Sequence, residues 1–367
     1  MTENLYEALK HCENNMIAFI GMAKNTGKTT ALNQAVKEAQ QAEKKLGILS
    51  YGRDGEAFDE MTNQQKPAIK IPADTYFVTA DSRLEQKKNL CQFITSLQIT
   101  TPLGEINLYK SKSNLLHPLE VELIGINRTS SLEQVRKLIL SECDFVFVDG
   151  ALDRKSSALP RLAEGLILST GAVLGSSVGG IVEKTDRFLR ILNLPALPPG
   201  RLSNYFLTKL NKSRDSLKGF FYWPDSDNII KLAADTSFEL KDRLAKILED
   251  EDFREKLQAG NSSLYLTLAG AFTSGLCDFI LQHDELQGMT IVLKDPTRVF
   301  VQGEEIAKLE QNDINIKMLD SMQLLALTVN PHNPVGRDIS SQKIRAELEN
   351  NWPELPIFDV KASDYRI

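Results

Sequence analysis

The stretch from Met16 to Thr30, MIAFIGMAKNTGKTT, most constrains what this chain can fold into. An apolar run that suits a buried strand enters a loop ending Gly27-Lys28-Thr29, and apolar residues then recur at helical spacing. Glycines let successive backbone N–H groups curl around an anion, and the following helix aims the positive end of its dipole at that anion. The sequence therefore predicts a phosphate-binding loop between a strand and a helix.

The loop also predicts a division of chemical roles. Lys28 is expected to reach the β- and γ-phosphates of a nucleotide, and the Thr29 hydroxyl to ligate Mg²⁺. The spacing is Gly-x5-Gly-Lys-Thr, because the first glycine is Gly21 and Met22 follows it. Lys24 is either an additional phosphate contact or an exposed loop lysine. The predicted nucleotide-binding residues are Gly21, Lys24, Asn25, Thr26, Gly27, Lys28, Thr29 and Thr30.

Two carboxylates follow strand-like runs elsewhere in the chain. Asp149 comes directly after the apolar residues 145–148, as in the Walker B arrangement, where a carboxylate holds Mg²⁺ directly or through a water. The competing interpretation is an Asp-Gly turn that merely ends a strand. Asp54 lies in the loop after residues 46–50 and either positions the attacking water or is one more exposed acid. The predicted catalytic residues are Lys28, Asp54 and Asp149, with Thr29 and Asp149 as metal ligands.

Strand-like and helical runs alternate along the first half of the chain, which predicts parallel βαβ units in a doubly wound, mostly parallel α/β sheet. The expected strands are 16–20, 46–50, 120–126, 145–148 and 165–169, and the expected helices are 29–44, 132–140 and 178–192. Residues of about 66–119 lack this regularity and are expected to form an insertion with a hairpin, serving as a lid, a partner surface or a plain structural extension.

The proline-rich segment LPALPPG at 194–200 predicts a domain boundary, since clustered prolines interrupt both helices and central strands. We expect a nucleotide-binding domain over 1–198 and a C-terminal α/β extension or second domain over 199–367. Within the latter, LYLTLAGAFTSGLCDFILQ is expected to be a buried helix, and LLALTVNP a buried strand ended by Pro331. If that strand joins the main sheet, Asn330, His332 and Asn333 lie at the ligand edge; otherwise they form a proline-stiffened turn.

Composition limits the classes of partner. The 43 Lys and Arg against 49 Asp and Glu give a net charge of −6, without a sustained basic block, so we expect no broad nucleic-acid-binding face. The four cysteines and four histidines are scattered and predict neither a disulfide framework nor a zinc site. No leader-like or 18-residue apolar stretch stands out, so a cytoplasmic protein without a membrane segment is expected.

Three motifs together resemble one family. GMAKNTGKTT, FVDGALDRKSSA followed by GLILSTGAVLGSS, and TVNPHNPVG are similar to the P-loop subunit of lysine 5,6-aminomutase reactivases, and the resemblance spans essentially the whole chain. It implies a P-loop NTPase that uses ATP and Mg²⁺ to help an adenosylcobalamin-dependent aminomutase exchange damaged cobalamin. The implied partners are the aminomutase, acting on lysine or ornithine, and a second subunit similar to mismatch-repair ATPases.

Two other functional classes fit the same residues. The longer loop also resembles that of dethiobiotin synthetase-like proteins, which implies an ATP-dependent ligase or carboxylase that activates a carboxylate as an acyl phosphate. A third hypothesis is an interaction protein that holds nucleotide without turnover. ATP is the default nucleotide and GTP the alternative, because no Asn-Lys-x-Asp guanine-reading motif is evident.

Overall fold

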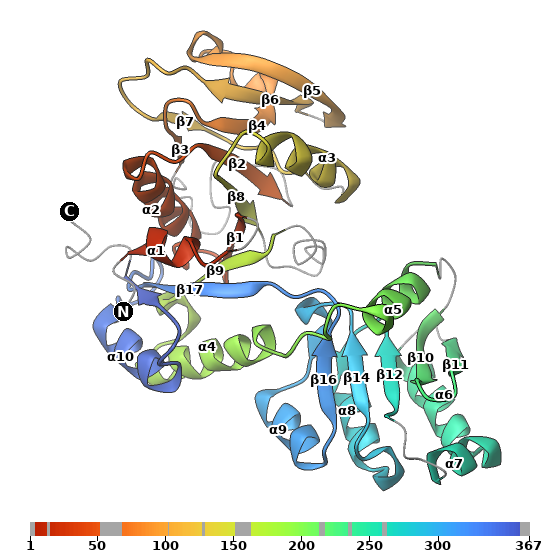
Figure 1. The fold of residues 1–367 in the computed structure, drawn as a ribbon. Helices are drawn as coiled ribbons and strands as arrows, with labels where there is room; N and C mark the ends of the chain where they lie inside the picture. Colours follow the sequence, from red (N-terminus) through yellow and green to blue (C-terminus); the bar gives the residue numbers. More distant parts are fainter. Residues whose placement is uncertain are drawn as a thin grey trace. The chain divides into compact units, whose positions relative to one another are not determined.

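The computed structural model describes residues 4–12, 15–51, 68–101, 103–126, 129–150, 163–212, 217–233, 237–258 and 263–359. The chain divides into two compact units. The first contains residues 1–186 and 322–367, and the second contains residues 187–321. Each unit has its own sheet and its own apolar core, so each is described separately (Figure 1).

A nine-stranded sheet forms the centre of the first unit, in the order β18-β17-β9-β1-β8-β2-β4-β6-β5. The strands from β18 to β4 run parallel to their neighbours, and β6 and β5 add an antiparallel hairpin at one edge. The bounds are β1 (Met16–Gly21), β2 (Leu46–Tyr51), β4 (Tyr76–Ala80), β5 (Cys91–Thr101), β6 (Gly104–Ser111), β8 (Phe145–Gly150), β9 (Gly165–Gly171), β17 (Gln323–Asn330) and β18 (Ile357–Phe358). The short strands β3 (Ile69–Ile71) and β7 (Leu119–Val121) pair separately.

Helices α1 (Leu5–Leu9) and α2 (Lys28–Gln41) share one apolar core with one face of this sheet. The period of two along each strand selects the residues that face them. Phe19 on β1 and Phe147 on β8 pack edge to face, with ring centroids 5.4 Å apart. Further members of this core are Leu5, Leu9, Ile17, Ala31, Leu32, Ala35, Val36, Ile48, Phe145 and Ile167.

Helices α3 (Thr129–Leu140) and α4 (Val178–Leu192) pack against the opposite face. Gly47 on β2 makes the approach of α3 possible, because a Cβ there would lie 2.4 Å from Ile139 Cγ2. On α4, the buried Thr185 hydroxyl lies 2.7 Å from that of Thr170 on β9. With helices on both faces, the first unit is a doubly wound α/β sheet. Helix α10 (Ser341–Asn351) packs near β17 and β18.

The strand order places a topological switch at β1. The chain passes from β1 through α2 to β2 on one side, then returns through β8, next to β1, and continues to β9 on the other side. The loops that leave the carboxyl ends of β1 and β9 therefore lead to helices on opposite faces of the sheet, α2 after β1 and α4 after β9. In open α/β sheets such a point forms the crevice in which ligands bind.

The second unit has a five-stranded sheet in the order β11-β10-β12-β14-β16. Strands β12 (Tyr265–Leu268), β14 (Thr290–Leu293) and β16 (Asn315–Met318) are parallel, whereas β10 (Leu217–Trp223) and β11 (Asn228–Ala233) form an antiparallel hairpin. Phe206 of α5 (Arg201–Lys212) belongs to the core on one face. The core on the other face includes residues of α6 (Ser237–Glu249), α7 (Glu251–Gln258), α8 (Ser274–Leu281) and α9 (Gly303–Gln311).

This division differs from the domains expected from sequence. The chain leaves the first unit inside α4 at Asp186 and returns at Met322, so β17 and β18 pair in the first sheet rather than in a C-terminal extension. A proline cluster marks an interruption of regular structure but does not reveal which sheet a later strand joins. Within residues 66–119, β4 extends the parallel sheet and β5 and β6 form the expected hairpin.

The helix expected over residues 264–282 is correct only for its second half. That segment contains β12, the short strand β13 (Phe272–Thr273) and α8. A run of apolar and small residues has no clear period, so the sequence does not separate a helix from a strand. Leu266 and Leu268, two positions apart, both pack in the core of the second unit, as alternate residues of a strand do. The expected strand 120–126 is also shortened, because β7 ends at Val121.

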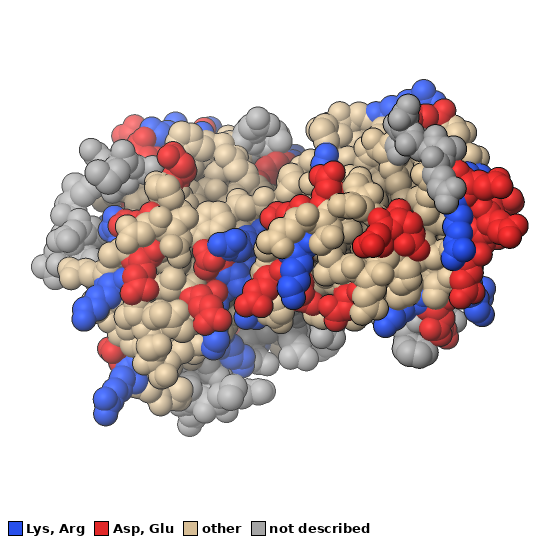
Figure 2. All heavy atoms as spheres, turned by 90° about the horizontal axis from the view of Figure 1, so that it is seen from below, with Lys and Arg blue, Asp and Glu red and all other residues tan. Residues whose placement is uncertain are grey.

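Charged side chains lie interspersed over the described residues on the face shown in Figure 2, where no broad basic area is visible. Among the helices that the structure describes, none is long and apolar enough to span a bilayer.

Glu38 on α2 generates a prediction for pH dependence. Its buried carboxylate accepts hydrogen bonds from Tyr6 N of α1 and Gln34 Nε2, each at 2.8 Å, and burial raises its pKa. The folded protein therefore holds this proton more tightly than the unfolded chain, so the associated stability is present below the ordinary glutamate pKa and is lost as pH rises through the raised value. Glu38→Gln has no proton to lose. Urea unfolding should show the variant gaining stability relative to wild type between pH 4 and 7.

The matched control is Glu347→Gln on the exposed side of α10, which should follow wild type at every pH. A constant difference between Glu38→Gln and wild type over this range would contradict the assigned cause.

Candidate functional site

The predicted loop leaves β1 at the switch point and is fixed by its own backbone. Met22 N donates to Ser169 O of β9 at 3.0 Å, and the Thr26 hydroxyl donates to Ala23 O at 2.9 Å. Thr26 is almost fully buried as a result. A Cβ on Gly21 would lie 2.5 Å from Thr26 Oγ1, so a glycine is needed where the loop folds back on the end of β1.

Gly27 begins α2 in a left-handed conformation, with φ of 90°, and Asn25 shares that region at φ of 64°. The first helical hydrogen bond, from Ala31 N to Gly27 O, is 2.9 Å long. Among the described residues, Gly27 at the N-cap has no side chain to cap this helix, and the first turn contains no acidic residue. The 14-residue helix therefore presents first-turn N–H groups and the positive end of its dipole, with no acidic residue in its own first turn.

Lys28, the first residue of α2, joins this helix to the end of β8. Its Nζ lies 2.8 Å from Asp149 Oδ1 and donates to Gly150 O at 3.0 Å. The parallel pairing of β1 and β8 sets Phe19 opposite Asp149, which brings the carboxylate to the edge from which the loop leaves. Both side chains keep partial access to solvent, at 26% and 20% of their full exposure.

This pair has a definite chemical capacity. A cation and a carboxylate that neutralise each other can each exchange partner when a phosphate brings negative charge and Mg²⁺ brings positive charge. Because both side chains keep partial access to solvent, the exchange of partners does not leave a charge fully buried and unpaired, and its free-energy cost stays low. Thr29, one residue on in the first turn of α2, is half-buried and supplies the only hydroxyl that the prediction assigned to the metal.

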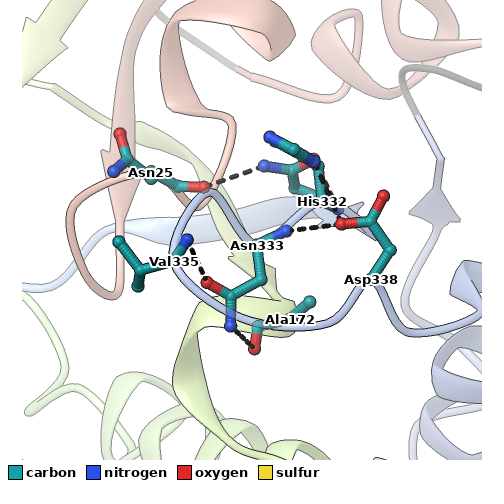
Figure 3. Close-up of polar contacts among 7 residues, drawn as sticks. Asn25, Ala172, His332, Asn333, Val335 and Asp338 are labelled. Atoms are coloured by element: carbon teal, nitrogen blue, oxygen red, sulfur yellow. Dashed lines mark hydrogen bonds and ion pairs between the residues drawn. The ribbon is translucent and has the colours of Figure 1, made fainter. Parts of the chain in front are cut away.

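A loop after β17 lies against the same site (Figure 3). Asn330, the last residue of β17, donates from Nδ2 to Asn25 O at 2.8 Å. Asn333 Nδ2 donates to Ala172 O at 3.3 Å, and its backbone N–H donates to Asp338 Oδ1 at 2.9 Å. His332 Nδ1 lies 3.0 Å from the same carboxylate oxygen. The loop is thus held to itself and to the ends of β1 and β9.

Asn330, His332 and Asn333 are expected at the ligand edge if the strand before Pro331 joins the main sheet. That strand, β17, pairs with β9 in the main sheet, so all three residues lie at its carboxyl edge. Buried hydroxyls support this edge from within, since Ser169 Oγ and Thr328 Oγ1 are 2.8 Å apart across β9 and β17.

The structure brings together the predicted loop residues from Gly21 to Thr30 with Asp149. Lys24 and Asn25 are exposed in the loop. Asp54 lies outside the described residues, so its predicted role stays a prediction. Sequence reasoning missed the contribution of Ser169, which acts through its backbone carbonyl and leaves no mark on residue type. It gave Asn330 only a conditional place, although Gly171 beside it offered a signal: a Cβ at 171 would lie 2.3 Å from Asn330 O.

Within the described part of the chain, no group of three or more His, Cys, Asp and Glu side chains is placed to hold a metal ion. The residues that fit Mg²⁺ are one carboxylate and one hydroxyl, at Asp149 and Thr29. Such a pair suits an ion that keeps most of its waters and takes further oxygens from a bound phosphate.

Comparisons with known proteins add little to this geometry. No family model and no curated protein matches the sequence. The kinase domain of Escherichia coli tyrosine kinase ETK is 15% identical, with a TM-score of 0.27 over 50% of this chain and 65% of that chain. The chimerical protein CapA2B2 is 12% identical, with a TM-score of 0.27 over 47% and 69%. This chain spans less than two thirds of the ETK domain. Neither similarity assigns a family or a function to this chain.

The class of fold follows from the chain's own geometry. A parallel α/β sheet, a Gly-Lys-Thr loop between its central strand and the next helix, and an acidic residue at the end of the neighbouring strand define the P-loop class of α/β proteins.

Gly21 provides a test of the loop geometry. Gly21→Ala should lower the free energy of unfolding by about 1–3 kcal/mol, because its Cβ would collide with Thr26 Oγ1. Thr26→Ala removes that atom, so in the double variant the cost of Gly21→Ala should be smaller than in the wild-type background. Urea unfolding of the four proteins gives the coupling.

Gly270→Ala is the matched control, since no atom lies within 4 Å of a Cβ there, and its unfolding should be close to that of wild type. Additive effects of Gly21→Ala and Thr26→Ala would contradict the close approach as the cause.

Proposed function

We propose that this protein binds a Mg²⁺-bound nucleoside triphosphate, ATP by default, at the loop of residues 21–30 and hydrolyses it. The Lys28–Asp149 pair at the start of α2 carries the proposal. On binding, Lys28 leaves the carboxylate for the β- and γ-phosphates, while the first-turn N–H groups of α2 receive the same anion. Asp149, freed from the lysine, would hold the metal together with Thr29.

Hydrolysis then needs a positioned water and compensation for the charge that develops on the transferred phosphoryl group. The metal supplies charge neutralisation when bound, and Lys28 adds a second cation on the phosphates. Asp54 remains the candidate for orienting the water. The preformed left-handed loop at Gly27 lowers the ordering cost of binding because its backbone is already folded.

The coupled process that we propose is reactivation of an adenosylcobalamin-dependent aminomutase. Its support is the resemblance of GMAKNTGKTT, FVDGALDRKSSA and TVNPHNPVG to the reactivase P-loop subunit. A radical cofactor that loses its adenosyl group leaves an inert corrinoid bound, and its release requires a coupled conformational change. The proposed partners are the aminomutase and a mismatch-repair-like ATPase subunit.

Lys28→Ala tests the nucleotide site. The variant should bind Mg²⁺-ATP at least about tenfold more weakly, a loss of about 1.4 kcal/mol, because a phosphate contact is removed. Calorimetric titration measures the affinity, and thermal unfolding should show that the fold is retained, since the side chain is only partly buried.

Lys37→Ala on the exposed side of the same helix is the matched control and should bind as wild type does. Asp149→Asn keeps the shape of the side chain and should weaken the dependence of affinity on Mg²⁺. Unchanged ATP affinity in Lys28→Ala would refute the site.

The client is tested by hydrolysis of ATP and GTP with Mg²⁺, first by the protein alone and then with an inactivated cobalamin-dependent aminomutase and its mismatch-repair-like partner. Turnover that rises only with both proteins, together with recovered mutase activity, is the expected result. Stimulation by a small carboxylic acid alone would instead support the ligase hypothesis. Bound nucleotide that is never hydrolysed would support the interaction protein.

A further inference from the structure

Asn330, the final residue of β17, lies between two glycines that belong to different segments. A Cβ on Gly27, in the loop, would lie 3.1 Å from Asn330 Cβ. A Cβ on Gly171, at the end of β9, would lie 2.3 Å from Asn330 O and 3.0 Å from its Cβ. Only 6% of Asn330 is exposed. The site thus has a close-fitting position for this one side chain.

Both ends of the Asn330 amide are used. Nδ2 donates to Asn25 O at 2.8 Å, and Oδ1 accepts from His332 N at 3.2 Å. The second bond fixes which way the amide points, so its N–H groups face the loop. A residue of the last parallel strands is thereby joined to the phosphate loop, which lies more than 300 positions earlier in the chain.

The bond to Asn25 O has a consequence for the loop. A trans peptide is planar, with its C=O and the following N–H pointing in opposite directions. Holding the Asn25 carbonyl toward Asn330 therefore fixes the Thr26 N–H on the side away from Asn330. Asn25 has a positive φ, a conformation that asparagine adopts more readily than other non-glycine residues.

We propose that Asn330 is a positioning residue of the phosphate loop: it sets the orientation of the Asn25–Thr26 peptide, and so preorganises the backbone donors that receive the phosphates. This inference rests on the proposed function, because it assigns a part of the same site. In this role Asn330 acts on the nucleotide only through its hydrogen bond to the loop.

A base-contacting role for Asn330 makes a different prediction, and the two are separated by a ligand without a base. Inorganic tripolyphosphate has the phosphates of ATP but no nucleoside. If Asn330 orders the loop, its replacement weakens the binding of tripolyphosphate and ATP by the same factor. If it contacts the base, only the affinity for ATP falls.

The experiment compares wild type with Asn330→Leu, which is close in shape but has no donor, and with Asn330→Ala, which removes the amide without adding bulk. Titration calorimetry with Mg²⁺-ATP and with Mg²⁺-tripolyphosphate should show a loss of about fivefold to tenfold for both ligands, the effect of one hydrogen bond. Thermal unfolding identifies any variant that is not folded, and the other variant then decides.

Asn312→Leu is the matched control. Its Nδ2 also donates to a backbone carbonyl at 2.8 Å, that of Lys308, but in the second unit, so both affinities should equal those of wild type. Unchanged tripolyphosphate affinity in a folded Asn330 variant would overturn the inference while leaving the proposed function standing. Wild type that binds neither ligand would overturn both.

Discussion

The Lys28–Asp149 ion pair ties the first residue of the helix after the phosphate loop to the end of the neighbouring strand, and the arrangement of the whole edge depends on it. The pair can form because β8 lies next to β1, at the switch in strand order. The helix that begins at this lysine has no side-chain cap on Gly27 and no acidic residue in its own first turn. A bound phosphate can replace Asp149 as the partner of Lys28, and a Mg²⁺ ion can replace Lys28 as the partner of Asp149.

Glycines make this edge compact enough to act as a site. Gly21 lets Thr26 fold back on the end of β1, and Gly27 lets α2 begin beside Asn330. Neither position tolerates a Cβ without displacement of a neighbour. The loop is therefore held by hydrogen bonds to β9 and β17, rather than by its own sequence alone.

The local patterns of the first unit predicted its fold well, for physical reasons. Met16–Ile20 and residues 145–148 are apolar on both faces, as central parallel strands must be, and helix 178–192 has the bounds that its spacing predicts. The return of β17 to the first sheet after the second unit depends on long-range pairing, which no local pattern carries. Local motifs predict Lys28 and Asp149 as site residues, whereas the backbone carbonyl of Ser169 leaves no mark on residue type.

The most direct measurement is a crystal structure of the protein with Mg²⁺ and a non-hydrolysable ATP analogue. The account predicts the phosphates at the start of α2, Lys28 Nζ on a phosphate oxygen instead of Asp149, and Asp149 and Thr29 around the metal. A nucleotide bound elsewhere, or one bound at the loop with the Lys28–Asp149 pair intact, would contradict it.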